Sequence, residues 1–214
     1  MACETLVLDY DGVIVDSEPV QLHSVNKVVA SYGVVITSTQ WTTVHMGNRT
    51  RTILKAVLPD MSDRELAALI AHKKEVHRGL RRADPLPCRP GIVELVGEAV
   101  KRAVPVVVAS SSSTVDIEED LRDLGLGDHI RHVVGGDAVE HPKPAPDAYL
   151  RALEVVDGNP STALAVEDTP IGISAAKAAG LYCIAYVNDF TSHLDLSEAD
   201  EVVQQLTPDL IGRL

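Results

Sequence analysis

The stretch TLVLDYDGVIVDSE, residues 5–18, places two aspartates, Asp9 and Asp11, directly after the apolar run Leu6 to Leu8. An uninterrupted apolar run of this kind is typical of a strand covered on both faces, as in a parallel sheet. Like charges held this close disfavour each other's ionisation, so the pair costs stability unless a cation or a reaction uses it. The stretch therefore predicts a buried strand that ends in a functional site.

Further short apolar runs follow along the chain, and helical patterns separate them. The runs are residues 104–109, 133–134, 163–166 and 183–187. Short buried strands that alternate with helices are typical of an α/β protein with a parallel sheet. We therefore predict that the five runs are strands of one sheet.

Two of the connecting helices have readable ends. Thr169 and Pro170 suit the N-cap and first position of a helix, and Gly180 suits the residue just after its end. A second helix is expected to start near Pro146, because the prolines of HPKPAP precede a stripe of helical period. That stripe consists of Tyr149, Leu150, Leu153 and Val156.

One long segment breaks the alternation, because from about Ser17 to Ala83 only helical patterns occur. Ser62 and Glu65 form a capping box at the start of one of them. The residues that follow at helical period are Leu66, Leu69, Ile70, Lys73, Val76, His77 and Leu80. The prolines and glycine of DPLPCRPG, residues 84–91, indicate a linker back to the α/β part.

These patterns predict the domain organisation. We expect a Rossmann-like parallel-sheet core made of residues 1–15 and 85–214, and a small all-helical cap of residues 16–84 inserted after the first strand. A chain of 214 residues is long enough for one well-filled core with such an insertion.

Composition and charge argue against several classes of partner. A formal net charge of -12 repels nucleic acid and anionic membranes. Charged or turn residues interrupt every apolar stretch before it reaches the about 18 residues that a membrane helix needs. The chain also enters its first strand at once, without a basic and apolar leader. We therefore expect a cytoplasmic monomer that binds neither nucleic acid nor membrane.

Polar side chains gather at the carboxyl ends of the predicted strands, where open parallel sheets bind their ligands. They are Asp9, Asp11, Ser110, Glu167 and Asp168, with Lys143 in the loop after the third strand. Carboxylates that converge in this way make a hard oxygen site for Mg²⁺. We predict that Asp9, Asp11, Glu167 and Asp168 are the metal ligands, so that the cation relieves the repulsion between the paired aspartates.

The same residues suit phosphoryl transfer. A carboxylate beside Mg²⁺ can attack phosphorus and form an aspartyl-phosphate, which splits one difficult hydrolysis into two easier steps. Asp11 would then protonate the leaving oxygen and later accept a proton from water. Lys143, the Ser110 hydroxyl and backbone N–H groups around Gly12 would hold the phosphoryl oxygens in the transition state.

The segments LDYDGV, VVVAS, HPKPAPDAYL and VEDTPIGISAAKAAG, in this order, resemble the four motifs of the haloacid dehalogenase superfamily. The helical insertion resembles the cap of the β-phosphoglucomutase and phosphoglycolate phosphatase branch. The resemblance implies that Asp9 is the nucleophile, Asp11 the acid and base, and Ser110 and Lys143 the phosphate holders. The presence of Asp11 argues against true dehalogenation.

The resemblance further implies a set of substrate-binding residues. They are Gly12, Ser111, Gln21, Gly47, Asn48 and Arg49. Gln21 stands where relatives in this branch often carry histidine, and the arginines of MGNRTR are offset from the usual position of the cap arginine. These departures leave the hydrolase chemistry intact and weigh against a mutase.

The expected function is that of a Mg²⁺-dependent phosphatase for a small phosphorylated metabolite, either a sugar phosphate or a nucleoside or C-glycoside monophosphate. A phosphomutase of the β-phosphoglucomutase type remains as an alternative. A phospho-receiver also holds a phosphoryl group with a strand-end aspartate, a hydroxyl and a lysine, but the helical insertion and Asp11 argue against it. The last alternative is a metabolite-binding relative without catalytic activity, which the complete set of motif residues disfavours.

Overall fold

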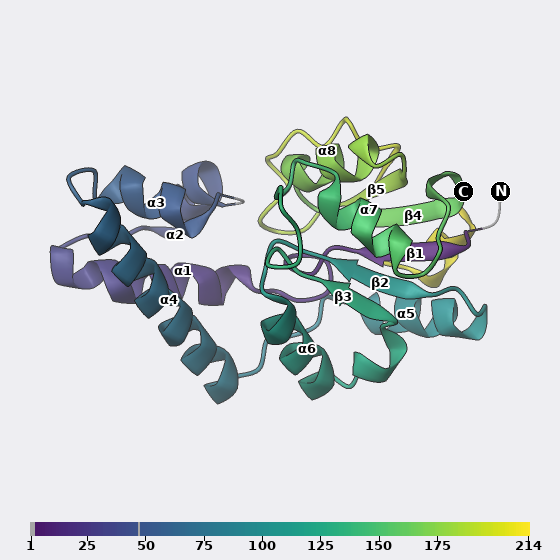
Figure 1. Ribbon diagram of the computed structural model, residues 1–214, viewed down its shortest axis with the longest axis horizontal. Helices are drawn as coiled ribbons and strands as arrows, with labels where there is room; N and C mark the ends of the chain where they lie inside the picture. The colour runs from purple at the N-terminus through teal and green to yellow at the C-terminus, as the bar shows by residue number, and fades with distance from the viewer. Residues whose placement is uncertain (1–2, 47) are drawn as a thin grey trace. The chain divides into compact units, whose positions relative to one another are not determined.

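The computed structural model describes residues 3–46 and 48–214. The chain divides into two compact units: Met1–Asp16 with Pro87–Leu214, called the sheet unit, and Ser17–Leu86, called the helical unit. Figure 1 shows the course of the chain through the helices and strands of both. Among the described residues, no helix combines the length and apolar character needed to cross a bilayer.

A six-stranded sheet forms the centre of the sheet unit, and all of its strand pairs are parallel. The strand order is β3-β2-β1-β4-β5-β6. The strands are β1 (Thr5–Leu8), β2 (Val106–Ala109), β3 (His132–Val134), β4 (Ala163–Glu167), β5 (Tyr182–Tyr186) and β6 (Glu201–Val203). The predicted parallel α/β class is confirmed.

Helices cover both faces of this sheet (Figure 1). They are α5 (Ile92–Lys101), α6 (Thr114–Asp123), α7 (Asp147–Glu154) and α8 (Pro170–Ala178), with single turns at Gly127–His129, Pro160–Thr162 and Pro208–Gly212. Helices α7 and α8 pack on one face, where Val7 of β1 shares a buried cluster with Tyr149 and Ile173. Helices α5 and α6 lie on the other face, so the strands are buried on both sides, as their continuous apolar runs predicted.

The strand order places a switch point at the centre of the sheet. After β1 the chain builds β2 and β3 outward on one side, and then β4, β5 and β6 outward on the other. In sheets of this kind the crevice at the carboxyl ends of the strands next to the switch point is where ligands bind. The residues that follow β1 and β4 therefore lie where this fold is expected to bind a ligand.

Most of the predicted boundaries are confirmed. Thr169 is the N-cap of α8 and its hydroxyl accepts from the Gly172 N–H, Pro146 is the N-cap of α7, and Gly180 follows α8 with a φ of 85°. The prediction for the α7 stripe is wrong at Leu150, which is 46% exposed, and at Val156, which lies beyond the end of α7 at Glu154. Leu150 lies on the solvent side of α7, so the apolar stripe is narrower than expected.

The sheet itself differs from expectation at its margins. Strand β2 starts at Val106, two residues later than predicted, because Pro105 has no N–H to donate to a ladder. Strand β6 was not predicted at all. It is three residues long, lies at the sheet edge and carries the exposed Val202, so it offers no apolar run to recognise.

The helical unit consists of α1 (Glu18–Val29), α2 (Ser38–Gln40), α3 (Thr50–Val57) and α4 (Asp63–Ala83), with a 3-10 turn at Ala30–Tyr32 and a π-helical turn at Trp41–His45. No strand occurs among its described residues. The capping box that starts α4 is present, with the Ser62 and Glu65 side chains each bonded to the other residue's backbone N–H. Helices α1 and α4 pack together around a core that includes Val25, Leu54 and Leu66.

The two chain segments that lead to the helical unit are hydrogen-bonded to each other within the sheet unit. The Asp16 N–H donates to the Pro87 carbonyl at 2.9 Å, and the Arg89 N–H donates to the Ile14 carbonyl at 2.8 Å. The Arg89 side chain, which is 7% exposed, adds an ion pair to Asp16 at 3.1 Å. We call these contacts the paired connection.

Candidate active site

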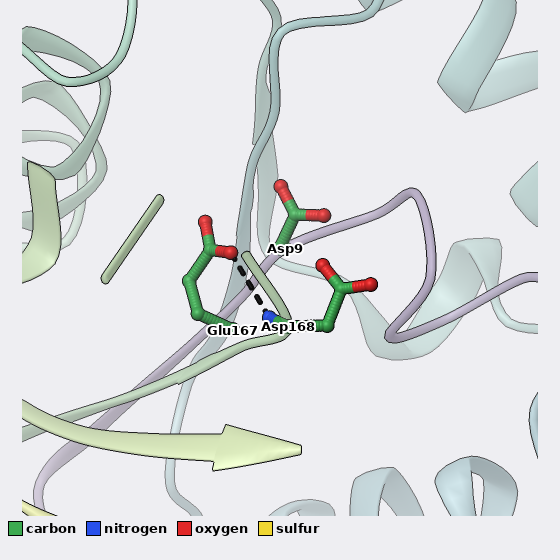
Figure 2. A group of neighbouring side chains, drawn as sticks. All are labelled: Asp9, Glu167 and Asp168. Carbon is green, nitrogen blue, oxygen red and sulfur yellow. Dashed lines mark hydrogen bonds between the residues drawn. The ribbon is translucent and has the colours of Figure 1, made fainter. Parts of the chain in front are cut away.

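Three acidic side chains meet where β1 and β4 end. Asp9 follows β1, Glu167 is the last residue of β4, and Asp168 follows it. Each offers an oxygen within 4.8 Å of the others, and all three residues are buried. Figure 2 shows them gathered at the strand ends, with the Asp168 backbone N–H donating to the Glu167 carboxylate. Buried carboxylates this close repel one another, so the cluster requires positive charge.

Lys143 supplies part of that positive charge. Its ammonium lies 2.6 Å from Asp9 Oδ1 and 2.6 Å from Glu167 Oε1, and it also donates to the Ala109 carbonyl at 2.9 Å. Burial opposes the charge on Lys143, but the Asp9 and Glu167 carboxylates outweigh it and raise the pKa of the lysine above its ordinary value. Lys143 is therefore held protonated between the two strand ends.

Glu167 accepts hydrogen bonds from this lysine and from several neighbouring donors. Its Oε1 accepts from Lys143 and from the Tyr149 hydroxyl at 2.7 Å, and its Oε2 accepts from the N–H groups of Asp168 and Thr169. Only glycine fits at position 172, since a Cβ there would lie 1.9 Å from Glu167 Oε1. Because protein donors engage both of its oxygens, we expect Glu167 to contribute less to a cation than Asp9 and Asp168.

Asp9 has the most strongly perturbed carboxyl group of the cluster. Burial raises its pKa to about 8 against the opposing effect of Lys143, and the nearby charges of Glu167 and Asp11 add to the rise. Around the Lys143 ammonium, the cluster gathers the three carboxyl groups of Asp9, Glu167 and Asp168. A cation bound near these carboxylates would favour their ionised forms.

Replacing Lys143 with methionine should reduce both stability and turnover. Removing one partner of a buried ion pair leaves Asp9 and Glu167 uncompensated, which costs about 3–5 kcal/mol. If Lys143 holds the phosphoryl group, as the sequence predicts, its loss also costs about 10²–10³-fold in kcat. Thermal unfolding and steady-state kinetics measure the two effects. Lys177→Met is the matched control, because Lys177 pairs with Asp200 on a half-exposed surface of α8. Equal losses in both variants would contradict the assignment.

Asp11 is turned toward the loop that follows β2. Its Oδ2 accepts from the Ser112 hydroxyl at 2.6 Å, and the Ser112 N–H donates to Ser110 Oγ at 3.0 Å. Ser110 is buried at the end of β2, whereas Ser111 is exposed. The structure thus brings Asp11 and Ser110 together through Ser112. The Asp11 carboxylate lies outside the group of Asp9, Glu167 and Asp168, and its role as a metal ligand stays a prediction.

Gly12 forms the turn between Asp11 and the segment after it. Its φ is 87°, a conformation that favours glycine, and a Cβ there would lie 2.0 Å from Asp168 Oδ2. The backbone of the first loop therefore packs directly against the Asp168 carboxylate. The predicted contact of Gly12 with a phosphoryl group stays a prediction.

The remaining predicted substrate residues belong to the helical unit. Gln21 lies on α1 and its side-chain oxygen accepts from the Lys73 ammonium of α4. Asn48 is exposed and bonded to the Val44 carbonyl, and Arg49 is the exposed residue that precedes α3. Gly47 lies outside the described residues. Substrate binding by these four residues stays a prediction.

Sequence reasoning missed three side chains of the site. They are Ser112, the Tyr149 hydroxyl and Asn188. Asn188 had a usable signal, because a polar residue just beyond the fifth apolar run must lie at the carboxyl ends of the strands. Ser112 sits in a run of four serines, and Tyr149 was assigned to the apolar stripe, so only the folded geometry distinguishes them.

This arrangement of strand ends and charges agrees with a known family. The sequence model of the family of haloacid dehalogenase-like hydrolases matches residues 6–186. The chain belongs to this family. The match includes β1 from its second residue onward, β2, β4 and β5 in full, and the whole helical insertion.

Curated relatives of this haloacid dehalogenase-like hydrolase include phosphatases. Protein CbbY of Cereibacter sphaeroides is 29% identical over 94% of this chain and 91% of its own length. The fructose-1-phosphate phosphatase YqaB of Escherichia coli is 32% identical over 82% of this chain and 92% of its own. Together with the family match, these relatives identify the protein as a phosphoric monoester hydrolase.

The fold is likewise shared with a solved relative. A crystal structure of a CbbY variant from Rhodobacter sphaeroides, in complex with xylulose-(1,5)bisphosphate, superimposes with a TM-score of 0.84 at 26% identity. The likeness covers 96% of this chain and 95% of the other. The predicted superfamily and its phosphatase and phosphoglucomutase-like branch are therefore confirmed.

Proposed function

We propose that this hydrolase is a Mg²⁺-dependent phosphatase that acts on small phosphorylated sugars through a phosphoryl group carried by Asp9. The observation that carries the proposal is the position of the Lys143 ammonium, 2.6 Å from Asp9 Oδ1 and beside the cluster of buried acids. A strand-end carboxylate flanked by a fixed cation and a second acidic side chain is what attack on a phosphate monoester requires.

The first step is attack by Asp9 on phosphorus. Lys143 engages Oδ1, so we assign the attack to Oδ2. A bond forms between this oxygen and phosphorus while the bond from phosphorus to the ester oxygen breaks. Asp11, two residues along the same loop, donates its proton to the leaving oxygen, which departs as the free alcohol.

The second step returns the enzyme to its starting state. Asp11, now ionised, accepts a proton from water as the water oxygen bonds to phosphorus. The bond between phosphorus and Asp9 breaks, inorganic phosphate leaves and the Asp9 carboxylate is regenerated. The hydrogen bond from Ser112 Oγ to Asp11 Oδ2 at 2.6 Å supports this role, since it fixes the orientation of the carboxylate that must exchange the proton.

The donor set supports Mg²⁺ as the cofactor. The ion prefers oxygen ligands, and the carboxylates of Asp9 and Asp168 would hold it together with the predicted ligands Asp11 and Glu167. When bound, it supplies positive charge that offsets the charges of the nucleophile and the phosphoryl group. Lys143 and Ser110 would hold the phosphoryl oxygens on the other side.

The relatives support a sugar as the substrate. One is named for fructose 1-phosphate and another was crystallised with a xylulose bisphosphate. These names belong to those proteins, and they indicate the first compounds to test here. The proposal is therefore a phosphatase for sugar phosphates, with nucleoside and C-glycoside monophosphates as further candidates.

A panel of phosphorylated metabolites tests the proposal, with inorganic phosphate and the dephosphorylated product measured in the same reactions. The panel contains fructose 1-phosphate, xylulose 1,5-bisphosphate, β-glucose 1-phosphate and nucleoside monophosphates, each with Mg²⁺. We expect phosphate to be released in near one-to-one ratio with substrate consumed, because Asp11 can activate water as soon as Asp9 is phosphorylated.

The same panel distinguishes the alternatives. Conversion of β-glucose 1-phosphate to glucose 6-phosphate without free phosphate would replace the phosphatase by a phosphomutase. A protein that becomes phosphorylated and keeps the phosphoryl group, without hydrolysing any metabolite of the panel, would indicate a receiver. Lack of turnover across the panel, with the compounds bound, would favour a metabolite-binding protein.

A further inference from the structure

Asn188 joins three parts of the sheet unit at the candidate site. It lies two residues beyond the end of β5 and is 6% exposed. Its Nδ2 donates to the Gly12 carbonyl at 3.2 Å and to Asp168 Oδ2 at 2.9 Å. One side chain thus ties the loop after β5 to the loop after β1 and to the acidic residue after β4.

The orientation of this amide is fixed by its own loop. Its Oδ1 accepts from the Phe190 N–H at 2.9 Å and from the Thr191 N–H at 3.1 Å, while the Asn188 N–H donates to Thr191 Oγ1 at 3.0 Å. Two N–H donors on one side of the amide and two acceptor oxygens on the other leave one arrangement of its oxygen and nitrogen that satisfies all four. The amide nitrogen must therefore face Asp168.

The consequence falls on the Asp168 carboxylate. A hydrogen bond to Oδ2 restrains rotation of the carboxylate about its bond to Cβ, and the Gly12 backbone packs against the same oxygen. Partners that orient a metal-ligating side chain affect metal affinity by about 10–100-fold when removed. Asn188 is placed to do this for Asp168.

We propose that Asn188 is a positioning residue that sets the Asp168 carboxylate and the Gly12 loop in place before a divalent cation binds. The inference rests on the proposed cation site and is independent of the proposed substrate. If so, the Asp168 carboxylate is already ordered in the cation-free protein, and cation binding loses little side-chain entropy there. Losing the amide should therefore weaken binding of the cation more than it changes turnover once the cation is saturating.

Asn188→Ser is the variant that tests this. Serine can keep a weaker form of the loop turn with its hydroxyl, but its side chain lacks the amide group that reaches Gly12 and Asp168. We expect Mg²⁺ affinity, measured by titration calorimetry on the full chain, to fall about 10–100-fold. The Mg²⁺ concentration for half-maximal activity should rise in parallel, while kcat at saturating Mg²⁺ stays near the wild-type value.

Thr191→Val is the matched control. Thr191 is 1% exposed and belongs to the same loop, and valine removes the oxygen that accepts from the Asn188 N–H while keeping the amide. It should lower the melting temperature measured in chelator and leave Mg²⁺ affinity close to wild type. Equal Mg²⁺ affinity in wild type and Asn188→Ser, or equal weakening in both variants, would overturn the positioning role.

The outcome separates this inference from the proposed function. Wild-type protein that binds Mg²⁺ and hydrolyses nothing would contradict the phosphatase, while the comparison of Asn188→Ser with Thr191→Val still decides the role of Asn188. Phosphatase activity in the wild type, together with unchanged Mg²⁺ affinity in Asn188→Ser, would support the phosphatase and contradict the positioning role of Asn188. Wild-type protein that does not bind Mg²⁺ would overturn both.

Discussion

Asp9→Asn is expected to reduce turnover by roughly 10⁴-fold to 10⁶-fold, the range seen when a nucleophile or its partner is removed. The amide has no ionised oxygen with which to form the bond to phosphorus. Its oxygen can still accept from Lys143, as Asp9 Oδ1 does at 2.6 Å, so the side chain should keep its place. Phosphate release from a good sugar phosphate substrate, with circular dichroism to verify the fold, measures the effect.

Asp157→Asn provides the control for this substitution. Asp157 is exposed, precedes β4 at the opposite end of the sheet, and has a φ of 52°, a conformation that asparagine tolerates well. The same chemical change there should leave turnover as it is in the wild type. A folded Asp9→Asn protein with wild-type rates would rule out the proposed nucleophile.

Excess chelator is expected to abolish activity, and Mg²⁺ should restore it. The nucleophile and the phosphoryl group are both negative, and Lys143 alone does not balance the acidic cluster, so their approach needs a further positive charge. Asp168→Ala should raise the Mg²⁺ concentration required for half-maximal activity at least about tenfold. Activity titrations with Mg²⁺ at constant ionic strength give both results.

Asp189→Ala is the control for the loss of negative charge. Asp189 is exposed, lies in the loop after β5 and follows Asn188 in the chain, so its substitution makes the same change in net charge outside the acidic cluster. Its Mg²⁺ requirement should match that of the wild type. Full activity in excess chelator, or the same shift in both variants, would exclude the predicted cation site.

The strands of the sheet and most of the polar residues at their carboxyl ends could be predicted because they depend on short local patterns. A continuous apolar run followed by a polar residue gives both the buried strand and the side chain at its carboxyl end, which is how Asp9, Ser110 and Asp168 were found. Strand β6 could not be found in this way, because an exposed edge strand of three residues has no buried run.

Other features of the site depend on contacts between distant segments. The hydroxyl of Tyr149 reaches Glu167 from α7, and the choice of Ser112 as the partner of Asp11 is made by the turn after β2. Leu150 follows the helical period but is exposed, whereas Tyr149 and Leu153 beside it on α7 are buried. None of these outcomes follows from spacing along the chain.

The paired connection has a consequence for how such a protein can change over evolutionary time. Asp16 and Pro87 are joined by a backbone hydrogen bond, so the segment between them leaves and re-enters the sheet unit at one point. The hydrogen bond between Arg89 and Ile14 and the ion pair between Arg89 and Asp16 hold the two ends of the segment together. We therefore expect substitutions within the segment, or an exchange of the whole segment, to leave the strand register of the sheet unchanged, because exposed junctions generally tolerate insertions. We therefore expect the helical unit to tolerate change more readily than the strand-end residues of the sheet unit, so the two can diverge at different rates.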